Sequence, residues 1–87
     1  MSNRVQNESI IGLWSDFGNY VSFEFYDDDS FRHINKIQEI DGMGTWEIDS
    51  DILYLTMPNG SLQAKMKLSG NMLTLDFNRV KYKLIKV

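Results

Sequence analysis

Apolar and polar residues alternate one by one along most of the chain from residue 20 onward, and this pattern constrains the fold more than any other feature. The alternation runs through the segments VSFEF, LYLTM, LQAKMKL, LTLDF and VKYKL. A period of two gives a strand one apolar face and one polar face. No long segment shows the 3.6-residue period of a helix. The sequence therefore predicts an all-β protein whose strands are each buried on one side.

Short clusters of turn-forming residues separate these segments. Asp, Asn, Ser, Gly and Pro supply the backbone conformations that tight turns need. Such clusters occur at Gly18-Asn19, Asp27–Ser30, Asp49–Asp51, Pro58–Gly60, Ser69–Asn71 and Asn78-Arg79. A longer loop is predicted over residues 38–43. The predicted strands are 11–17, 20–26, 31–37, 44–49, 52–57, 61–68, 72–77 and 80–86.

About eight short strands joined by tight turns favour an up-and-down antiparallel arrangement. Closure into a barrel removes the two bare edges that such a sheet would otherwise expose. A chain of 87 residues has the length of one domain. We therefore expect a single eight-stranded barrel over residues 10–87, preceded by residues 1–9 as a flexible or one-turn segment. The chain has no cysteine, so packing alone must stabilise it.

Gly12 and Trp14 begin the first predicted strand, and we expect both on its inner face. Trp14 would then close one end of the barrel, and Gly12 would leave room beside the indole. The last strand should lie next to the first in a closed barrel. A basic residue of the last strand could then cover the indole through a cation–π contact. Lys86 is the first candidate, with Lys83 and Arg79 as alternatives.

The order of several short motifs resembles a known family. These motifs are GLW, FEFYDDDSF, GTWEI, LYL, LTL and YKLIK, spread over residues 11–86. Together they are similar to the lipocalins and the wider calycin group, and in particular to small bacterial lipocalin-like domains. The resemblance implies an eight-stranded barrel with Gly12, Trp14 and Lys86 as the fold signature. It also suggests a carrier of small ligands.

The predicted inner face carries about twenty mostly large side chains, including Leu62 and Val80. At native packing density these should fill a small barrel. A filled interior is therefore the first expectation, and a ligand cavity is the alternative. The side chains expected to wall such a cavity are Phe25, Phe31, Trp46, Met57, Met66 and Tyr82.

Catalytic and metal-binding patterns find little support in the sequence. His33 is the single histidine; it is either a structural residue or a ligand contact, and no Ser/Asp partner stands at a recognisable spacing. The Asp27–Asp29 run lacks the Gly and Glu offsets of a calcium loop. No phosphate loop and no nucleophile motif occurs. We predict that the protein is not an enzyme and uses no cofactor or metal.

Charge is divided unequally along the chain. Eleven of the twelve acidic residues lie in residues 1–51, and six of the nine Lys and Arg residues lie in residues 52–87. The predicted outward face of Lys65, Lys67, Lys81 and Lys83 lacks aromatic residues for base stacking, so we do not expect nucleic-acid binding. No segment has the apolar length of a membrane helix. Without an apolar leader the chain is expected in the cytoplasm, with a secreted mature fragment as the alternative.

These features together predict a non-enzymatic protein-interaction or regulatory module. One form would be an inhibitor of a host partner, as in small acidic proteins of phages and mobile elements. Tyrosine is enriched where proteins meet, and Tyr20, Tyr26 and Tyr54 are the candidate contact residues. The alternative function is binding of a small apolar ligand inside the barrel. Apolar residues outside the joint of the first and last strands, with Ile11 beside Val87 and Leu13 beside Ile85, suggest a monomer or a weak homodimer.

Overall fold

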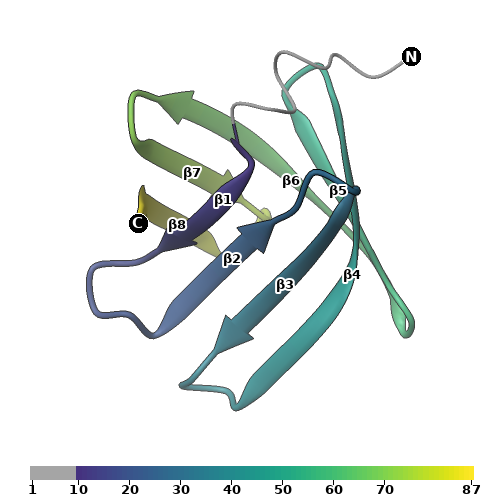
Figure 1. Ribbon diagram of the computed structural model, residues 1–87, viewed down its shortest axis with the longest axis horizontal. Coiled ribbons are helices and arrows are strands. Elements are labelled where there is room, and N and C mark those ends of the chain that lie inside the picture. Colours follow the sequence, from purple (N-terminus) through teal and green to yellow (C-terminus); the bar gives the residue numbers. More distant parts are fainter. Residues whose placement is uncertain (1–9) are drawn as a thin grey trace.

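The computed structural model describes residues 10–87 as a closed barrel of eight antiparallel strands in sequence order (Figure 1). The strands are β1 (Gly12–Ser15), β2 (Val21–Phe25), β3 (Ser30–Asn35), β4 (Ile40–Asp49), β5 (Ile52–Met57), β6 (Gly60–Ser69), β7 (Met72–Asp76) and β8 (Lys81–Lys86). This confirms the predicted all-β, up-and-down architecture. The prediction for residues 1–9 lies outside the described residues.

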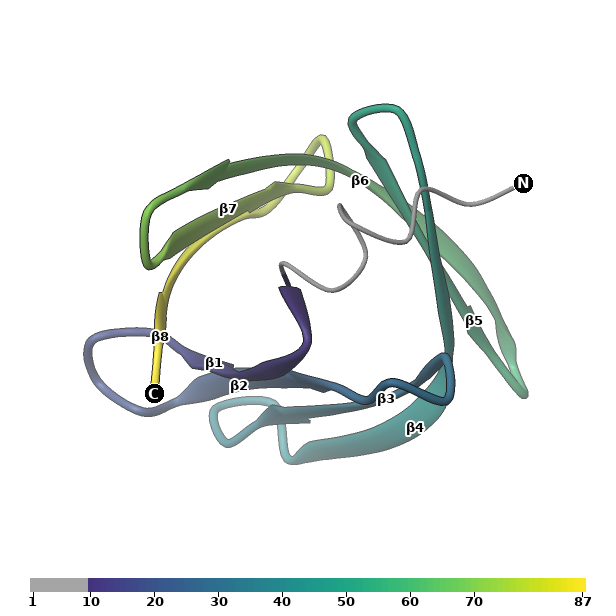
Figure 2. The same cartoon turned by 45° about the horizontal axis from the view of Figure 1, so that its top comes forward.

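The strands follow one another around a ring when the molecule is tilted as in Figure 2. Alternate turns therefore gather at opposite ends of the barrel. We call one end the closed end; it holds Ile10 and the turns 26–29, 50–51 and 70–71. The open end holds the turns 16–20, 36–39, 58–59 and 77–80.

The predicted loop over residues 38–43 is wrong, because β4 already begins at Ile40. The turn from β3 to β4 spans only residues 36–39. The side chain of Asn35 caps it: Oδ1 accepts hydrogen bonds from the amides of Ile37 and Gln38, at 3.0 and 3.1 Å. Gly42 and Gly44 interrupt the apolar alternation and so resemble loop residues in the sequence. In the barrel they are strand residues paired with His33 and Phe31.

The hydrophobic core fills the closed end and the middle of the barrel. Its largest fully buried side chains are Trp14, Phe23, Phe25, Phe31, Ile10, Leu53, Leu55, Leu73, Leu75 and Leu84. Trp14 is 1% exposed, and its Nε1 donates a 2.8 Å hydrogen bond to the carbonyl oxygen of Ile10. This bond ties the segment that precedes β1 onto the core and closes that end.

β1 and β8 close the barrel through a short joint. Trp14 pairs with Lys86 and Ser15 with Ile85, and the amide of Val87 donates to the carbonyl oxygen of Leu13 at 2.9 Å. The register differs by two residues from the predicted one, in which Leu13 faced Ile85. β1 is only four residues long, so Ile11 precedes the strand and Phe17 follows it.

Lys86 covers the indole of Trp14 at this joint. Its Nζ lies 5.0 Å from the ring centroid and donates to the carbonyl oxygen of Ile11. A Cβ at position 12 would lie 2.7 Å from that Nζ. Gly12 thus leaves room for the lysine that covers the indole. Its φ of 130° also favours glycine over any residue with a side chain.

Candidate functional site

A cavity of about 390 Å³ opens at the open end of the barrel. The residues around it come from β2 to β6, from β8 and from three of the four turns at this end. They are Phe23, Phe31, His33, Gln38, Ile40, Leu55, Met57, Asn59, Leu62, Phe77, Val80 and Tyr82. Phe23, Phe31 and Leu55 belong to the buried core, so the cavity reaches into the barrel. Its volume is that of a small-molecule binding site.

The cavity owes part of its space to Gly42, an inner-face residue of β4 that has no side chain. Gly42 is half-buried on the inner face. A Cβ built on it would touch only the Sδ of Met57, at 3.8 Å. Gly44, two residues further on, has no such space, because its Cβ would collide with the carbonyl oxygen of Thr56. The predicted filled interior is therefore found at the closed end and not at the open end.

Aromatic rings form one wall of the cavity. Phe23 stacks on the imidazole of His33, with centroids 4.2 Å apart and planes 18° apart. Tyr82 makes T-shaped contacts with Phe23 and Phe77, with ring centroids 6.0 and 5.9 Å apart. These contacts arise because the inward residues of β2, β3 and β8 reach the same depth of the barrel. The wall offers flat apolar faces to a guest molecule.

Two polar groups on this wall have no hydrogen-bond partner among the described residues. The Nδ1 of His33 lies 3.1 Å from the carbonyl oxygen of Ser22, but its Nε2 makes no hydrogen bond within residues 10–87. The hydroxyl of Tyr82 likewise bonds to no other residue in this range. Burial lowers the pKa of His33, against a smaller opposing effect of the Ser22 carbonyl. The imidazole is therefore neutral at pH 7.

The mouth of the cavity has an apolar rim. Leu62 and Val80, predicted to lie in the core, are 48% and 46% exposed and line the cavity at its mouth. Ile37, in the turn before β4, is 72% exposed, and Phe17, in the turn after β1, is 80% exposed. Both turns belong to the open end, although neither residue lines the cavity. Exposed apolar side chains gathered around a cavity are typical of binding sites.

The structure divides the six residues predicted to wall a cavity into two groups. Phe31, Met57 and Tyr82 line it. The other three, Phe25, Trp46 and Met66, are buried elsewhere in the core. Phe25 and Trp46 meet edge to face at 5.5 Å, and the indole Nε1 of Trp46 donates to the carbonyl oxygen of Tyr26 at 3.1 Å. That bond places Trp46 near the turn 26–29 of the closed end.

Sequence reasoning did not assign Phe23, Leu55 and Phe77 to the cavity, although it placed all three on the inner face. The strand register contains the missing signal. Phe23 pairs with His33, and Leu75 with Tyr82, which sets their depth in the barrel. The sequence allows residues to be counted from each turn along a strand. This count shows how deep a residue lies in the barrel only when the closed end is known. Ile10, outside every predicted strand, closes that end.

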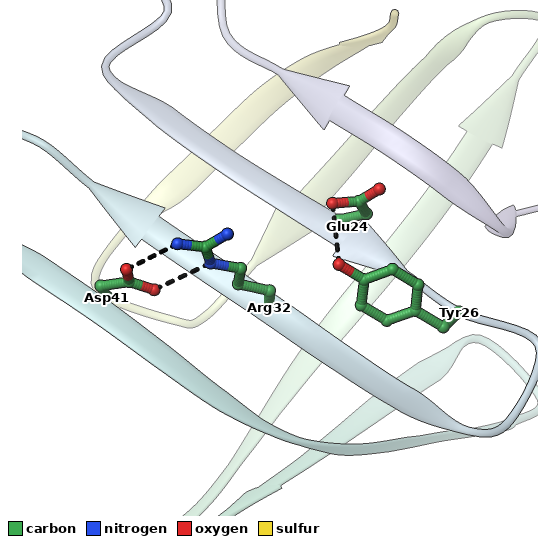
Figure 3. Close-up of polar contacts among 4 residues, drawn as sticks. All are labelled: Glu24, Tyr26, Arg32 and Asp41. Carbon is green, nitrogen blue, oxygen red and sulfur yellow. Dashed lines mark hydrogen bonds and ion pairs between the residues drawn. The ribbon is translucent and has the colours of Figure 1, made fainter.

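The three tyrosines predicted to contact a partner lie on different parts of the molecule. Tyr20 is 53% exposed in the turn after β1, at the open end. Tyr26 follows β2 at the closed end, half-buried, and its hydroxyl donates to Glu24 at 2.9 Å (Figure 3). That hydrogen bond raises the pKa of Tyr26. Tyr54 lies on β5, paired with Glu47 and Gln63. The structure thus brings together no tyrosine surface.

The outer face of β2 to β4 carries the polar contacts drawn in Figure 3. Arg32 and Asp41 form a bidentate ion pair: Nε donates to Oδ1 at 3.0 Å and Nη2 donates to Oδ2 at 2.8 Å. The Arg32 hydrogen bonds lower the pKa of Asp41. Both side chains are about half exposed, so the pair contributes little to stability. It faces away from the cavity.

The acidic turn at residues 27–29 is a hairpin connection. The carboxylate of Asp28 accepts hydrogen bonds from the amide and the hydroxyl of Ser30. These bonds lower the pKa of Asp28. Within residues 10–87 no group of three or more His, Asp or Glu side chains is placed to hold a metal ion. In the same part of the chain, no helix is long and apolar enough to cross a membrane.

Fold and site together define a small up-and-down barrel, closed at one end and carrying an apolar cavity at the other. Comparison with models of protein families, with curated proteins and with solved structures finds no match for this chain. The geometry of the cavity is therefore the basis for a functional proposal.

Proposed function

We propose that the protein binds a small apolar molecule, without chemical conversion, in the cavity at the open end. The observation that carries the proposal is a volume of about 390 Å³ that reaches from an apolar rim to buried core residues. Each 100 Å² of apolar ligand surface removed from water contributes about 2.5 kcal/mol. The cavity is already formed in the folded barrel. The resemblance to lipocalin-like domains supports the same function.

Filling the cavity tests this proposal. A leucine at position 42 has room, because Gly42 lies next to open space on the inner face and is not among the residues with positive φ. We expect the wild-type protein to enhance the fluorescence of N-phenyl-1-naphthylamine, a neutral apolar dye, and Gly42→Leu to abolish the enhancement without loss of thermal stability.

The matched control is Met43→Leu. Met43 is the next residue of β4, faces outward and is 60% exposed. This variant should bind the dye as the wild type does. Equal dye binding by Gly42→Leu, or no binding by the folded wild type, would contradict the proposal.

A second candidate function is interaction with another protein, favoured by the exposed apolar side chains at the open end. Phe17 and Ile37 stand out on two turns and do not line the cavity. A partner that docks on them should be captured by cross-linking in the native host with the wild type and with Gly42→Leu. Capture should be lost with Phe17→Ser/Ile37→Ser. If the protein binds a small ligand, Gly42→Leu should lose dye binding and Phe17→Ser/Ile37→Ser should keep it. The two variants therefore distinguish the two functions.

A further inference from the structure

We propose that the ligand of this cavity is a neutral, planar aromatic molecule with an N–H or O–H donor, and that Nε2 of His33 accepts its hydrogen bond. This inference rests on the proposed function and specifies the class of molecule that the cavity selects. Three features carry it: the tautomer of His33, the absence of charged residues around the cavity, and the flat aromatic wall.

The tautomer follows from the partner of Nδ1. A carbonyl oxygen only accepts hydrogen bonds, so the Nδ1 that lies 3.1 Å from the Ser22 oxygen carries the hydrogen. In a neutral imidazole the other nitrogen then bears a lone pair and accepts. Nε2 makes no hydrogen bond within residues 10–87. A half-buried acceptor without a partner is unfavourable, and a donor group on a ligand would satisfy it.

The charge of the wall argues against anionic ligands. None of the residues around the cavity is Lys, Arg, Asp or Glu. A carboxylate that entered would lose its hydration without gaining an opposite charge. It would also face the lone pair of His33. A neutral ligand avoids both costs.

The planar shape follows from the rings. Phe23 and His33 lie nearly parallel, while Tyr82 and Phe77 meet in a T-shaped contact. Gly42 pairs with His33 across β3 and β4 and leaves the space beside the imidazole empty. A flat ring placed there can meet aromatic faces and edges at the distances that such pairs prefer.

Three naphthalene derivatives test the inference with the protein at pH 8: 2-naphthol, naphthalene and 2-naphthoate, compared by calorimetric titration. We expect 2-naphthol to bind about two- to tenfold more tightly than naphthalene, which is the range of one net hydrogen bond. We expect 2-naphthoate to bind least. In an apolar cavity without the acceptor, naphthalene would bind more tightly than 2-naphthol, because the naphthol hydroxyl would lose its hydration without gaining a hydrogen bond.

Two variants assign the acceptor. His33→Phe keeps a ring that can stack on Phe23 but removes Nε2, so the preference for 2-naphthol should disappear while naphthalene still binds. Tyr82→Phe is the matched control, because it removes the other unpaired polar group of the wall and should keep the preference. Equal affinity for naphthol and naphthalene in the wild type, or loss of the preference in Tyr82→Phe alone, overturns the inference and leaves the cavity function standing. Failure of all three compounds to bind overturns both.

Discussion

Two glycines on the inner face of β4 differ sharply in what surrounds them. A Cβ at Gly44 would lie 2.0 Å from the carbonyl oxygen of Thr56 and 2.9 Å from the ring of Phe31. A Cβ at Gly42 would meet one flexible sulfur atom at 3.8 Å. The close approach of β5 requires a glycine at position 44. No contact in the fold requires a glycine at position 42. Gly42 is the residue that a binding function would need.

This contrast gives a paired prediction. Gly44→Ala should lower the free energy of unfolding by about 3 kcal/mol, since backbone atoms must move to admit the methyl group. Gly42→Ala should leave stability equal or slightly higher, because alanine loses less conformational entropy on folding. Urea denaturation of the two variants measures the difference. Similar stabilities for both would show that β4 and β5 are further apart than described.

Trp14 is the residue on which the closed end depends. It is 1% exposed, bonds to Ile10 and is covered by Lys86. Trp14→Ala should cost about 3–5 kcal/mol, a large share of the stability of a domain of this size. Thermal unfolding followed by circular dichroism tests this; a melting temperature within a few degrees of the wild type would disprove the central position of Trp14.

His33 gives stability a dependence on pH. Burial lowers its pKa in the folded protein, so the unfolded chain binds the proton more readily. Its contribution is therefore complete above the unfolded value of about 6.5 and declines as the pH falls below that value. We expect the melting temperature to drop between pH 7.5 and 5.5, and His33→Phe to drop less. Asp28 and Asp41, whose pKa values are lowered, act only at more acidic pH. Parallel curves for the two proteins would refute the role of His33.

At the scale of elements, the turns could be predicted from the sequence and the start of β4 could not. Asp, Asn, Ser and Gly mark the turns because they tolerate positive φ, as Asn19, Asp29, Ser50 and Asn78 show. The turn before β4 instead contains Glu39, with φ of 56°, which no composition signal announces. The two glycines that follow then concealed the strand. Gly42, one of these two glycines, also leaves open space on the inner face. The sequence pattern that hid the start of β4 therefore also hid part of the cavity.

Glu39 offers a test of this turn. A glutamate in the left-handed region costs about 1 kcal/mol or more, whereas glycine adopts it freely. Glu39→Gly should therefore stabilise the protein by about 0.5–1 kcal/mol in chemical denaturation. Asn78→Gly, at φ of 79°, is the control and should change little, because asparagine already tolerates this conformation. Destabilisation by Glu39→Gly would show that the turn has another geometry.

At the scale of the whole molecule, the order of the strands turns the uneven distribution of charge along the chain into an uneven distribution around the barrel. The strands run around the ring in sequence order, so the acidic first half and the basic second half of the described chain become opposite walls (Figure 2). Lys65 and Asp76 and Lys81 lie side by side across β6 to β8, where a second hollow of about 300 Å³ lies on that wall. The molecule thus carries a lateral dipole that can orient an approaching charged partner.

The short joint between β1 and β8 has a kinetic consequence. Every other pairing in residues 10–87 joins neighbouring strands, whereas the contact of Lys86 with Ile11 spans 75 residues. Hairpins between neighbouring strands close small loops and form early. The joint of β1 and β8 closes a loop of nearly the whole chain, at a higher entropic cost, and gains only two residue pairs. It should therefore form after the rate-limiting step. Lys86→Met, which keeps the aliphatic stem and removes the charge, should accelerate unfolding in stopped-flow experiments and leave the refolding rate almost unchanged. A slower refolding rate would place ring closure within the folding nucleus.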